Sequence, residues 1–195
     1  SLIAHQCIAE GYQTTLIDRR EIAHGSSSAT TSMLQYEIDT PLFELIEMIG
    51  EQAAVDSYWA CFNSIDDLGK IAKKIRSKCG FRKKDSLYFA ALKKDVPWLT
   101  KEFQTRKKHG FPVSWIEPSE IEEQYGMVGT FGGILSSQGG SIDAFCLAHE
   151  LLQYDQKRGL SIYDKTDLVK KLHTKNGVTL TTEYGNAINA KKVIY

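Results

Sequence analysis

The sequence lacks the cysteine pairs that stabilise small secreted proteins through disulfide bonds. It has only four cysteines among 195 residues, widely scattered and without a C-x-x-C pair: Cys7, Cys61, Cys79 and Cys146. This spacing fits neither a disulfide framework nor a zinc site, so we expect four reduced thiols. The five histidines also show no metal-binding interval with a cysteine or a carboxylate, and we therefore expect no metal ion.

Excess charge of one sign and long apolar runs are also missing. The 24 basic residues balance 24 acidic ones, which gives no global field of the kind that selects nucleic acid. No apolar run approaches the ~20 residues that cross a bilayer, and residues 1–10 lack the pattern of a signal peptide. We therefore expect a cytoplasmic chain with a small-molecule partner, no nucleic acid and no membrane span. The sequence leaves the oligomeric state open.

What is present at the start of the chain predicts the second half of a βαβ unit. Apolar residues recur at helical spacing from Leu2 to Ile8, and Gly11 is a natural helix stop. The run "YQTTLID" then predicts a short buried strand that ends in an acid, Asp18. The first strand of such a unit is not in the sequence, and the last residues, "NAKKVIY", predict a strand that stops without a turn. From both ends we therefore expect the sequence to be a fragment of a longer chain.

The middle of the chain predicts a mixture of helices and strands. Thr40 followed by Pro41 predicts a helix start, because Thr can cap free amides and Pro suits the first helical position. Residues 42–75 predict two helices, broken near Gly50 or rejoined by Asp56. Further elements are expected as a strand over residues 85–92, a helix over 96–110 and a Gly-flanked strand with a turn over 131–143.

Local signals also mark the later elements. Ser119 and Glu122 stand three residues apart before a short helix, which is the pattern of a capping box. Residues 141–159 are amphipathic and predict a helix. The dipeptide Asn176-Gly177, flanked by alternating segments, predicts a hairpin within a β-meander that forms the rest of the chain.

Together these elements predict an α/β fold in two parts. Residues 1–40 and 141–195 have features of a nucleotide-binding fold, whereas residues 41–140 form a mixed helical and strand insert. We therefore expect an incomplete Rossmann-like domain made of the two outer segments, and an inserted α+β substrate domain between them.

One stretch, "LIDRREIAHGSSSATTSMLQYE", has side chains suited to a nucleotide. Asp18 stands where a ribose can offer its hydroxyl pair, and a carboxylate accepts both hydrogen bonds. The hydroxyl run after it suits a pyrophosphate, with Arg19 or Arg20 to offset the charge. A solvated loop over residues 26–32 and a plain turn residue at Asp18 are the alternatives, and the residues alone leave both open.

The order of these parts resembles the D-amino-acid oxidase family of FAD-dependent oxidoreductases, which includes glycine oxidase, sarcosine oxidase and glycerol-3-phosphate dehydrogenase. Four stretches and one strand step are similar: "SLIAHQCIAEGY", "TTLIDRR", "HGSSSATTSML", "GSIDA" and Val169 to Leu172. The chain departs from the family pattern at Ala144, where Pro is common. It also departs at Ser32, where a Gly usually lies close to the flavin.

The resemblance implies FAD as the cofactor. It also assigns residues of this chain to the parts of FAD, from the adenosine to the flavin ring. These are Asp18 on the ribose, Arg19 beside the adenine or phosphates, Ser26 and Ser27 on the pyrophosphate, Ser32, Met33 and Leu34 along the flavin ring, and Val169 at the adenine through its backbone. Core packing is a compatible alternative for Met33 and Leu34. The Gly-rich turn and most substrate-clamping residues of the family would lie outside the chain, so no catalytic residue is assigned.

The activity implied by the resemblance is that of an FAD-dependent oxidoreductase. A small amine, amino acid or hydroxy substrate would transfer a hydride to the flavin. Two alternatives stay open: a non-catalytic nucleotide-binding or interaction module with the same fold, and an NAD-dependent Rossmann enzyme. The Ser run after Asp18 favours FAD over NAD, because the flavin half of FAD needs an extended segment there.

Overall fold

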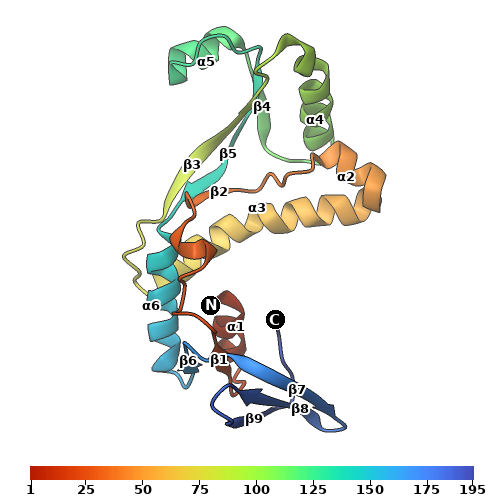
Figure 1. Ribbon diagram of the computed structural model, residues 1–195. Helices are drawn as coiled ribbons and strands as arrows, with labels where there is room; N and C mark the ends of the chain where they lie inside the picture. Colours follow the sequence, from red (N-terminus) through yellow and green to blue (C-terminus); the bar gives the residue numbers. More distant parts are fainter. The chain divides into compact units, whose positions relative to one another are not determined.

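A computed structural model describes residues 1–195 (Figure 1). The backbone divides into two compact units. Unit 1 comprises Ser1–Thr30 and Ala144–Tyr195, and unit 2 comprises Thr31–Asp143. Both units mix helices with strands, and the strands pair in parallel and antiparallel fashion. This architecture confirms the predicted α/β class.

The centre of unit 1 is a pair of parallel strands flanked by two helices. Strand β1 (Thr15–Ile17) pairs with β6 (Ser161–Tyr163). The helices are α1 (Leu2–Ala9) and α6 (Ala144–Gln156). Their buried core is small and apolar: Ala4, Ile8, Leu152 and Leu160. The predicted helix, Gly turn and strand at the start of the chain are therefore confirmed, although the strand is only partly buried.

A buried polar pair joins the two helices of unit 1. Nδ1 of His5 on α1 lies 2.9 and 3.1 Å from the two carboxylate oxygens of Asp155 on α6. The two side chains are only 6% and 0% exposed. Removing one partner from such a pair leaves an uncompensated buried group, which typically lowers the free energy of unfolding by roughly 3–5 kcal/mol. The pair therefore fixes α1 against α6.

An antiparallel meander forms the rest of unit 1. Its strands are β7 (Leu168–Thr174), β8 (Gly177–Thr182) and β9 (Ala187–Ala190). The predicted hairpin is confirmed, but its two-residue loop is Lys175 and Asn176, because Gly177 already pairs with Thr174. A Cβ on Gly177 would lie 2.3 Å from the carbonyl oxygen of Ala190, so the glycine is needed for the close approach of β9. The predicted meander also begins later than expected, because β6 pairs with β1.

Unit 2 is built on an antiparallel sheet with β5 (Gly133–Ser141) at its centre. Strand β3 (Arg82–Phe89) pairs along one side of β5, and β2 (Met33–Gln35) and β4 (Val113–Ile116) pair with opposite ends of the other side. The helical elements of the unit are α2 (Leu42–Ile49), α3 (Glu51–Lys74), η2 (Lys93–Asp95), α4 (Val96–Lys108) and α5 (Pro118–Tyr125). No helix of the chain combines the length and the apolar character needed to cross a bilayer.

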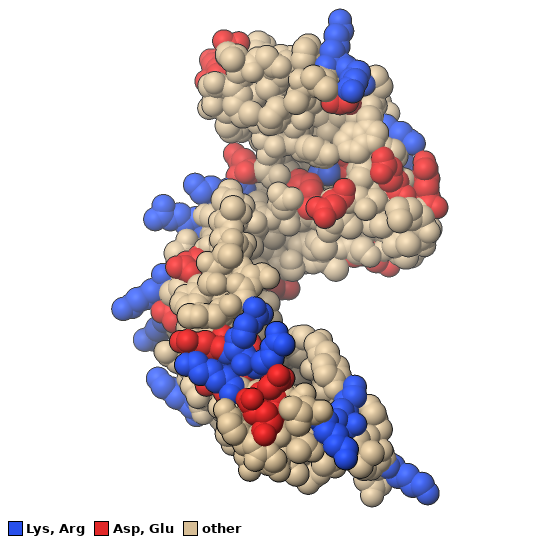
Figure 2. Space-filling view, viewed as in Figure 1, with Lys and Arg blue, Asp and Glu red and all other residues tan.

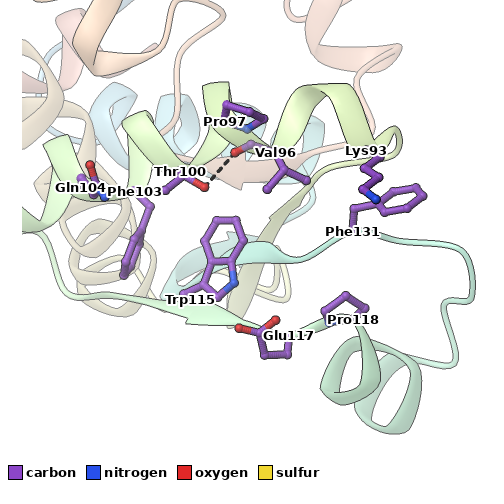
Figure 3. A pocket seen from close by; sticks show the side chains of 10 residues that line it. All are labelled: Lys93, Val96, Pro97, Thr100, Phe103, Gln104, Trp115, Glu117, Pro118 and Phe131. Atoms are coloured by element: carbon purple, nitrogen blue, oxygen red, sulfur yellow. Dashed lines mark hydrogen bonds between the residues drawn. The ribbon is translucent and has the colours of Figure 1, made fainter.

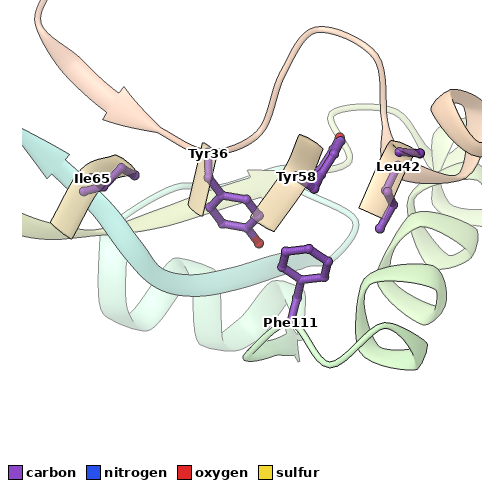
Figure 4. Close-up of a cluster of buried hydrophobic side chains, with 6 residues drawn as sticks. Tyr36, Leu42, Tyr58, Ile65 and Phe111 are labelled. Carbon is purple, nitrogen blue, oxygen red and sulfur yellow. The ribbon is translucent and has the colours of Figure 1, made fainter. Parts of the chain in front are cut away.

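The main core of unit 2 lies between the sheet and α3. Its buried residues, half of them aromatic, are Tyr36, Leu42, Ala54, Tyr58, Ile65 and Phe111 (Figure 4). The rings of Tyr36 and Phe111 are stacked, with centroids 5.9 Å apart and planes 3° apart. A second cluster of Ala90, Leu99 and Ile134 packs α4 against the same sheet. Helices α3 and α4 therefore both pack against this sheet.

Two predicted helix starts are wrong in detail. Thr40 does not cap α2, whose first free amides, those of Leu42 and Phe43, donate instead to the carboxylate of Glu102 at 3.0 and 3.2 Å. The capping box of α5 is formed by Glu117 and Glu120 and not by Ser119 and Glu122. Pro118 explains this shift, because its fixed φ suits the first helical position, which makes Glu117 the N-cap, two residues before Ser119.

The predicted break in the long helical segment is confirmed at Gly50. Helix α2 ends at Ile49 and α3 begins at Glu51. Gly50 between them has a φ of 90°, in a region that other residues adopt only with strain. The glycine thus permits the change of direction between two helices.

Candidate cofactor-binding site

The acid predicted to bind a ribose lies at the end of the parallel strand pair. Asp18 directly follows β1, and its backbone N–H donates to the carbonyl of Tyr163 on β6 at 3.0 Å. The carboxyl ends of adjacent parallel strands are where open α/β sheets bind their ligands. Oδ1 of Asp18 accepts the backbone N–H of Arg20 at 2.9 Å, so the residue also shapes the turn. The two interpretations of Asp18 are therefore compatible.

The segment before β7 is tied to this strand end. The backbone N–H of Thr166 donates to the carbonyl of Asp18, and that of Lys165 donates to the carbonyl of Arg20, both at 3.0 Å. Val169 lies three residues further along and is 63% exposed. The register of β7 against β8 skips it, since Leu168 faces Thr182 and Lys170 faces Thr181. Val169 thus occupies a β-bulge, where a backbone position is left out of the ladder.

The serine run forms a short exposed turn. Ser26–Ser28 make up the 3-10 turn η1, and the Ser28 hydroxyl donates to the carbonyl of Gly25 at 2.9 Å. The hydroxyls of Ser26 and Ser27 are exposed and have no hydrogen-bond partner in the chain. Two free hydroxyls on one turn can donate to an anion without first losing another partner.

An arginine lies beside the start of this turn. A Cβ built on Gly25 would lie 3.1 Å from Nη2 of Arg20, so the guanidinium rests against the glycine. The family resemblance assigned Arg19, which is exposed and forms no ion pair in the chain. The pattern of the residues alone could not separate the two arginines, because the turn at Asp18 decides which of them folds back toward the serines.

Two histidines lie near the same turn, although nothing in the sequence singled out His149. The ring of His24 lies 5.6 Å from that of Phe145 on α6, and the ring of Phe145 lies 4.4 Å from that of His149. Nε2 of His149 is buried and has no hydrogen-bond partner. These contacts place the first turns of α6 next to η1.

The residues predicted to line the flavin ring belong to unit 2. Ser32 has a φ of 57°, in the left-handed region that favours glycine, which is the residue that the resemblance places here. Its carbonyl accepts the backbone N–H of Ile142 at 3.2 Å. Met33 is 60% exposed, whereas Leu34 packs toward the core of α3. Of the two, only Met33 therefore has a side chain that a ligand could reach.

A buried charge network anchors the chain just after β2. The Arg106 guanidinium lies 2.6 Å from Glu102 through Nε, and 3.1 Å from Glu37 and 3.4 Å from the Tyr36 hydroxyl through Nη1. Oε2 of Glu37 is buried without a partner. Burial alone would lower the pKa of Arg106, but Glu102, Tyr36 and Glu37 together outweigh it and hold that pKa above its usual value. Arg106 therefore stays charged.

Burial also governs the tyrosines around this network. It raises the pKa of Tyr36, an effect that the charge of Arg106 partly offsets. It raises the pKa of Tyr58 further, with the nearby Glu102 carboxylate acting in the same direction. The Tyr58 hydroxyl donates to the carbonyl of Thr40 at 2.8 Å. The Tyr58 hydroxyl is thus a structural donor, whereas the Tyr36 hydroxyl accepts a hydrogen bond from Arg106.

A groove of about 690 Å³ lies elsewhere on unit 2, between α4, β4 and the start of α5. Figure 3 shows the rings of Phe103 and Trp115 on its wall. The wall is mainly apolar, and Lys93 and Glu117 are the charged residues that line it. It has no cluster of groups suited to chemistry. Across the structure, no group of three or more His, Cys, Asp or Glu side chains could hold a metal ion.

Comparisons with solved structures show which fold this is. Glycine oxidase from Geobacillus kaustophilus matches with a TM-score of 0.78 and 18% identity over 97% of this chain and 50% of that chain. L-proline dehydrogenase from P. horikoshii matches with a TM-score of 0.75 and 17% identity, over 96% of this chain and 46% of that chain. L-amino acid deaminase from Proteus myxofaciens matches with a TM-score of 0.75 and 16% identity, over 96% of this chain and 41% of that chain. The chain thus spans half or less of the length of these neighbours, and the likeness shows the fold.

The family itself is shown by a sequence model. No curated protein matches the chain. The model described as DAO, FAD dependent oxidoreductase, matches residues 1–195, which is the whole of the chain. This match confirms the resemblance to the family, and FAD is the cofactor on which the family depends. The chain belongs to the DAO family of FAD-dependent oxidoreductases.

Proposed function

We propose that the protein is an FAD-dependent oxidoreductase that transfers a hydride from a small amine, amino acid or hydroxy substrate to flavin. The observation that supports this most is the tip of β1, where Asp18 is followed by the exposed Ser26 and Ser27 hydroxyls. Names of structural neighbours, such as glycine oxidase and L-proline dehydrogenase, favour an amino acid among the three substrate classes. FAD, when bound, supplies the two-electron chemistry, and the protein orients the substrate.

The adenosine and pyrophosphate would be held by residues of unit 1. Asp18 would accept the ribose hydroxyls, for which its second carboxylate oxygen has no other donor in the chain. Ser26 and Ser27 would donate to the pyrophosphate, and Arg20 or Arg19 would offset its charge. These donors and acceptors fit the chemistry of the two groups.

The adenine would be held by backbone. A β-bulge leaves Val169 out of the ladder, so its peptide groups are candidates for the edge of the base. The side chain is exposed and would contribute contact area only. This role would not depend on the identity of the residue, which explains why composition cannot reveal it.

The flavin ring would contact residues of unit 2. We assign it to Ser32, Met33 and Leu34, with Met33 as the side chain that touches it, because Leu34 packs toward α3. On this proposal residues 1–40 and 141–195 serve the cofactor, and residues 41–140 form the substrate domain. The cytoplasmic location expected from the sequence stays a prediction.

The test is made on the full-length protein as its gene encodes it. Purified protein should show visible flavin absorbance, or acquire it with added FAD. Anaerobic addition of amino acids should then bleach the absorbance. Bound flavin that no amine, amino acid or hydroxy acid reduces would indicate a non-catalytic binding module. A protein that stays colourless after addition of FAD would refute the proposal.

A further inference from the structure

Positive charge gathers on unit 2 where α3 ends and β3 begins. Residues 70–84 contain eight of the 24 basic residues of the chain and no aspartate or glutamate, although acidic and basic residues balance over the whole sequence. All eight are exposed, and we call them the basic cluster: Lys70, Lys73, Lys74, Arg76, Lys78, Arg82, Lys83 and Lys84. A neutral chain thus carries one strongly cationic segment.

Packing brings the two ends of this segment together. Phe81, directly before β3, lies against Gly69 of α3, where a Cβ would be only 2.6 Å from the Phe81 ring. Nζ of Lys83 on β3 donates to Asp66 of α3 at 2.8 Å. Figure 2 shows Lys and Arg side chains projecting beside the lower part of β3. Cations from the last turns of α3 and from the first residues of β3 therefore share one surface.

Little within the chain neutralises this surface. Lys70 and Lys83 are paired with aspartates of α3. Five cations form no ion pair in the chain: Lys73, Lys74, Arg76, Arg82 and Lys84. Lysines in the last turn of a helix complement its dipole, and charges on an edge strand such as β3 oppose unwanted pairing. These two roles account for a few of the cations, and an anionic partner would relieve the repulsion among the rest.

The composition of the basic cluster selects the kind of partner. No large apolar side chain between residues 50 and 87 is exposed. The cluster therefore has no apolar group to insert into a bilayer and no aromatic ring to stack on a base. An extended polyanion would also meet the 24 acidic residues of the chain. A compact acidic protein can match the cluster alone.

The basic cluster reaches the strand next but one to that of Met33. Ser141 on β5 stands opposite Met33 of β2 on one side and opposite Arg82 of β3 on the other. Met33 and Arg82 are therefore two strand spacings apart, roughly 10 Å. A partner bound at the cluster would be close to the residue that we assign to the flavin ring. Weak encounters between redox proteins use small interfaces of this kind.

We propose that the basic cluster is the docking surface for an acidic one-electron carrier protein that reoxidises the flavin. The inference rests on the proposed function. A hydride from the substrate brings two electrons and one proton to FAD. Two carrier molecules then accept one electron each, and the proton passes to solvent. The cluster steers the carrier by charge and raises the rate of encounter. Exposed charge pairs are weak, so a reduced carrier can leave for the next.

The test uses the full-length holoprotein and one haem protein in two charge states. Native cytochrome c is basic through its surface lysines, and partial succinylation replaces these charges by carboxylates. Reduction of each form is followed anaerobically with an amino acid that bleaches the flavin. At low salt the succinylated form should be reduced roughly 10-fold faster than the native form, and added salt should remove the difference.

Two matched variants decide whether the basic cluster is the surface that docks the carrier. Both replace three exposed lysines of unit 2 by glutamine and so remove the same net charge. The cluster variant carries Lys73→Gln, Lys74→Gln and Lys84→Gln, and the control variant carries Lys93→Gln, Lys94→Gln and Lys107→Gln. The first should slow reduction of succinylated cytochrome c roughly 10-fold at low salt, whereas the second should change it by about twofold or less. Bleaching of the flavin by substrate should be equal in both.

A second readout needs no turnover. Binding of succinylated cytochrome c to the oxidised holoprotein is measured by calorimetry, beside phosphatidylserine-containing vesicles and a short DNA duplex. Weaker binding of the cytochrome to the cluster variant than to the control variant is the expected result. If the variants bind and react alike, if native cytochrome c reacts as fast, or if only vesicles or DNA depend on the cluster, the docking surface is refuted while the oxidoreductase stands. A protein that takes up no FAD refutes both proposals.

Discussion

The carboxylate of Glu102 lies 3.0 Å from the backbone nitrogen of Leu42, a residue sixty positions earlier in the chain, and 2.6 Å from Nε of Arg106. One buried side chain thus caps the first turn of α2 and neutralises an arginine on α4. Arg106 also donates a hydrogen bond to the carboxylate of Glu37, which lies just after β2, the strand that contains Met33. Through these contacts α2, α4 and the end of β2 are held together.

Replacing Glu102 by alanine should strongly destabilise the protein. The change removes the cap of α2 and leaves Arg106 charged and without its main partner, so we expect a loss of about 3–5 kcal/mol in the free energy of unfolding. Urea denaturation would measure it. Glu47→Ala is the matched control, since Glu47 and its partner Lys101 are exposed and such pairs contribute about 1 kcal/mol or less. Equal losses in the two variants would contradict the network.

High pH should destabilise the protein through its buried tyrosines. Burial raises the pKa of Tyr36 and of Tyr58 in the folded state, whereas both ionise near pH 10 when unfolded. Their contribution is fully present below pH 10 and is lost as pH rises further, by roughly 1.4 kcal/mol per pH unit for each. Absorbance at alkaline pH should show that two of the nine tyrosines ionise only on unfolding. Titration of all nine before unfolding would exclude this.

Backbone strain at Ser32 predicts a difference between two small substitutions. Both Ser32→Gly and Ser32→Ala remove the hydroxyl, but only glycine adopts a φ of 57° without strain. We expect the glycine variant to be more stable than the alanine variant by about 1 kcal/mol. Thermal unfolding of the two proteins side by side would measure it. An alanine variant as stable as the glycine variant would show that the position is not strained.

Local chemistry explains which parts of the fold were predictable. Gly50 and Pro97 punctuate helices through their own backbone geometry, so the break after α2 and the start of α4 are visible in the sequence. The cap of α2 was not, because Glu102 reaches it from another helix and no local pattern records that contact. The start of α5 was misplaced because Pro118 takes the first helical position, so that the capping box forms between Glu117 and Glu120 and not at Ser119.

The candidate site shows the same division. The position of Asp18 at a strand end could be predicted because a strand ending in an acid is a local pattern, and its role at a ribose stays a prediction. The glycine expected from the family at position 32 fits the observed backbone. The contact of Arg20 with Gly25 and the bulge at Val169 could not be predicted, because each depends on how a turn or a strand pair is closed. His149 was missed since its surroundings come from another part of unit 1.

The measurement that tests the central claim most directly is the dissociation constant of FAD for the full-length apoprotein and two variants. Asp18→Asn should weaken binding roughly 10- to 100-fold, because a charged acceptor for the ribose is lost. Asp164→Asn is the matched control, since Asp164 follows the neighbouring parallel strand β6, and it should change binding by only about twofold. If Asp18→Asn and Asp164→Asn bind FAD equally well, or if the parent protein binds none, the account of this site is wrong.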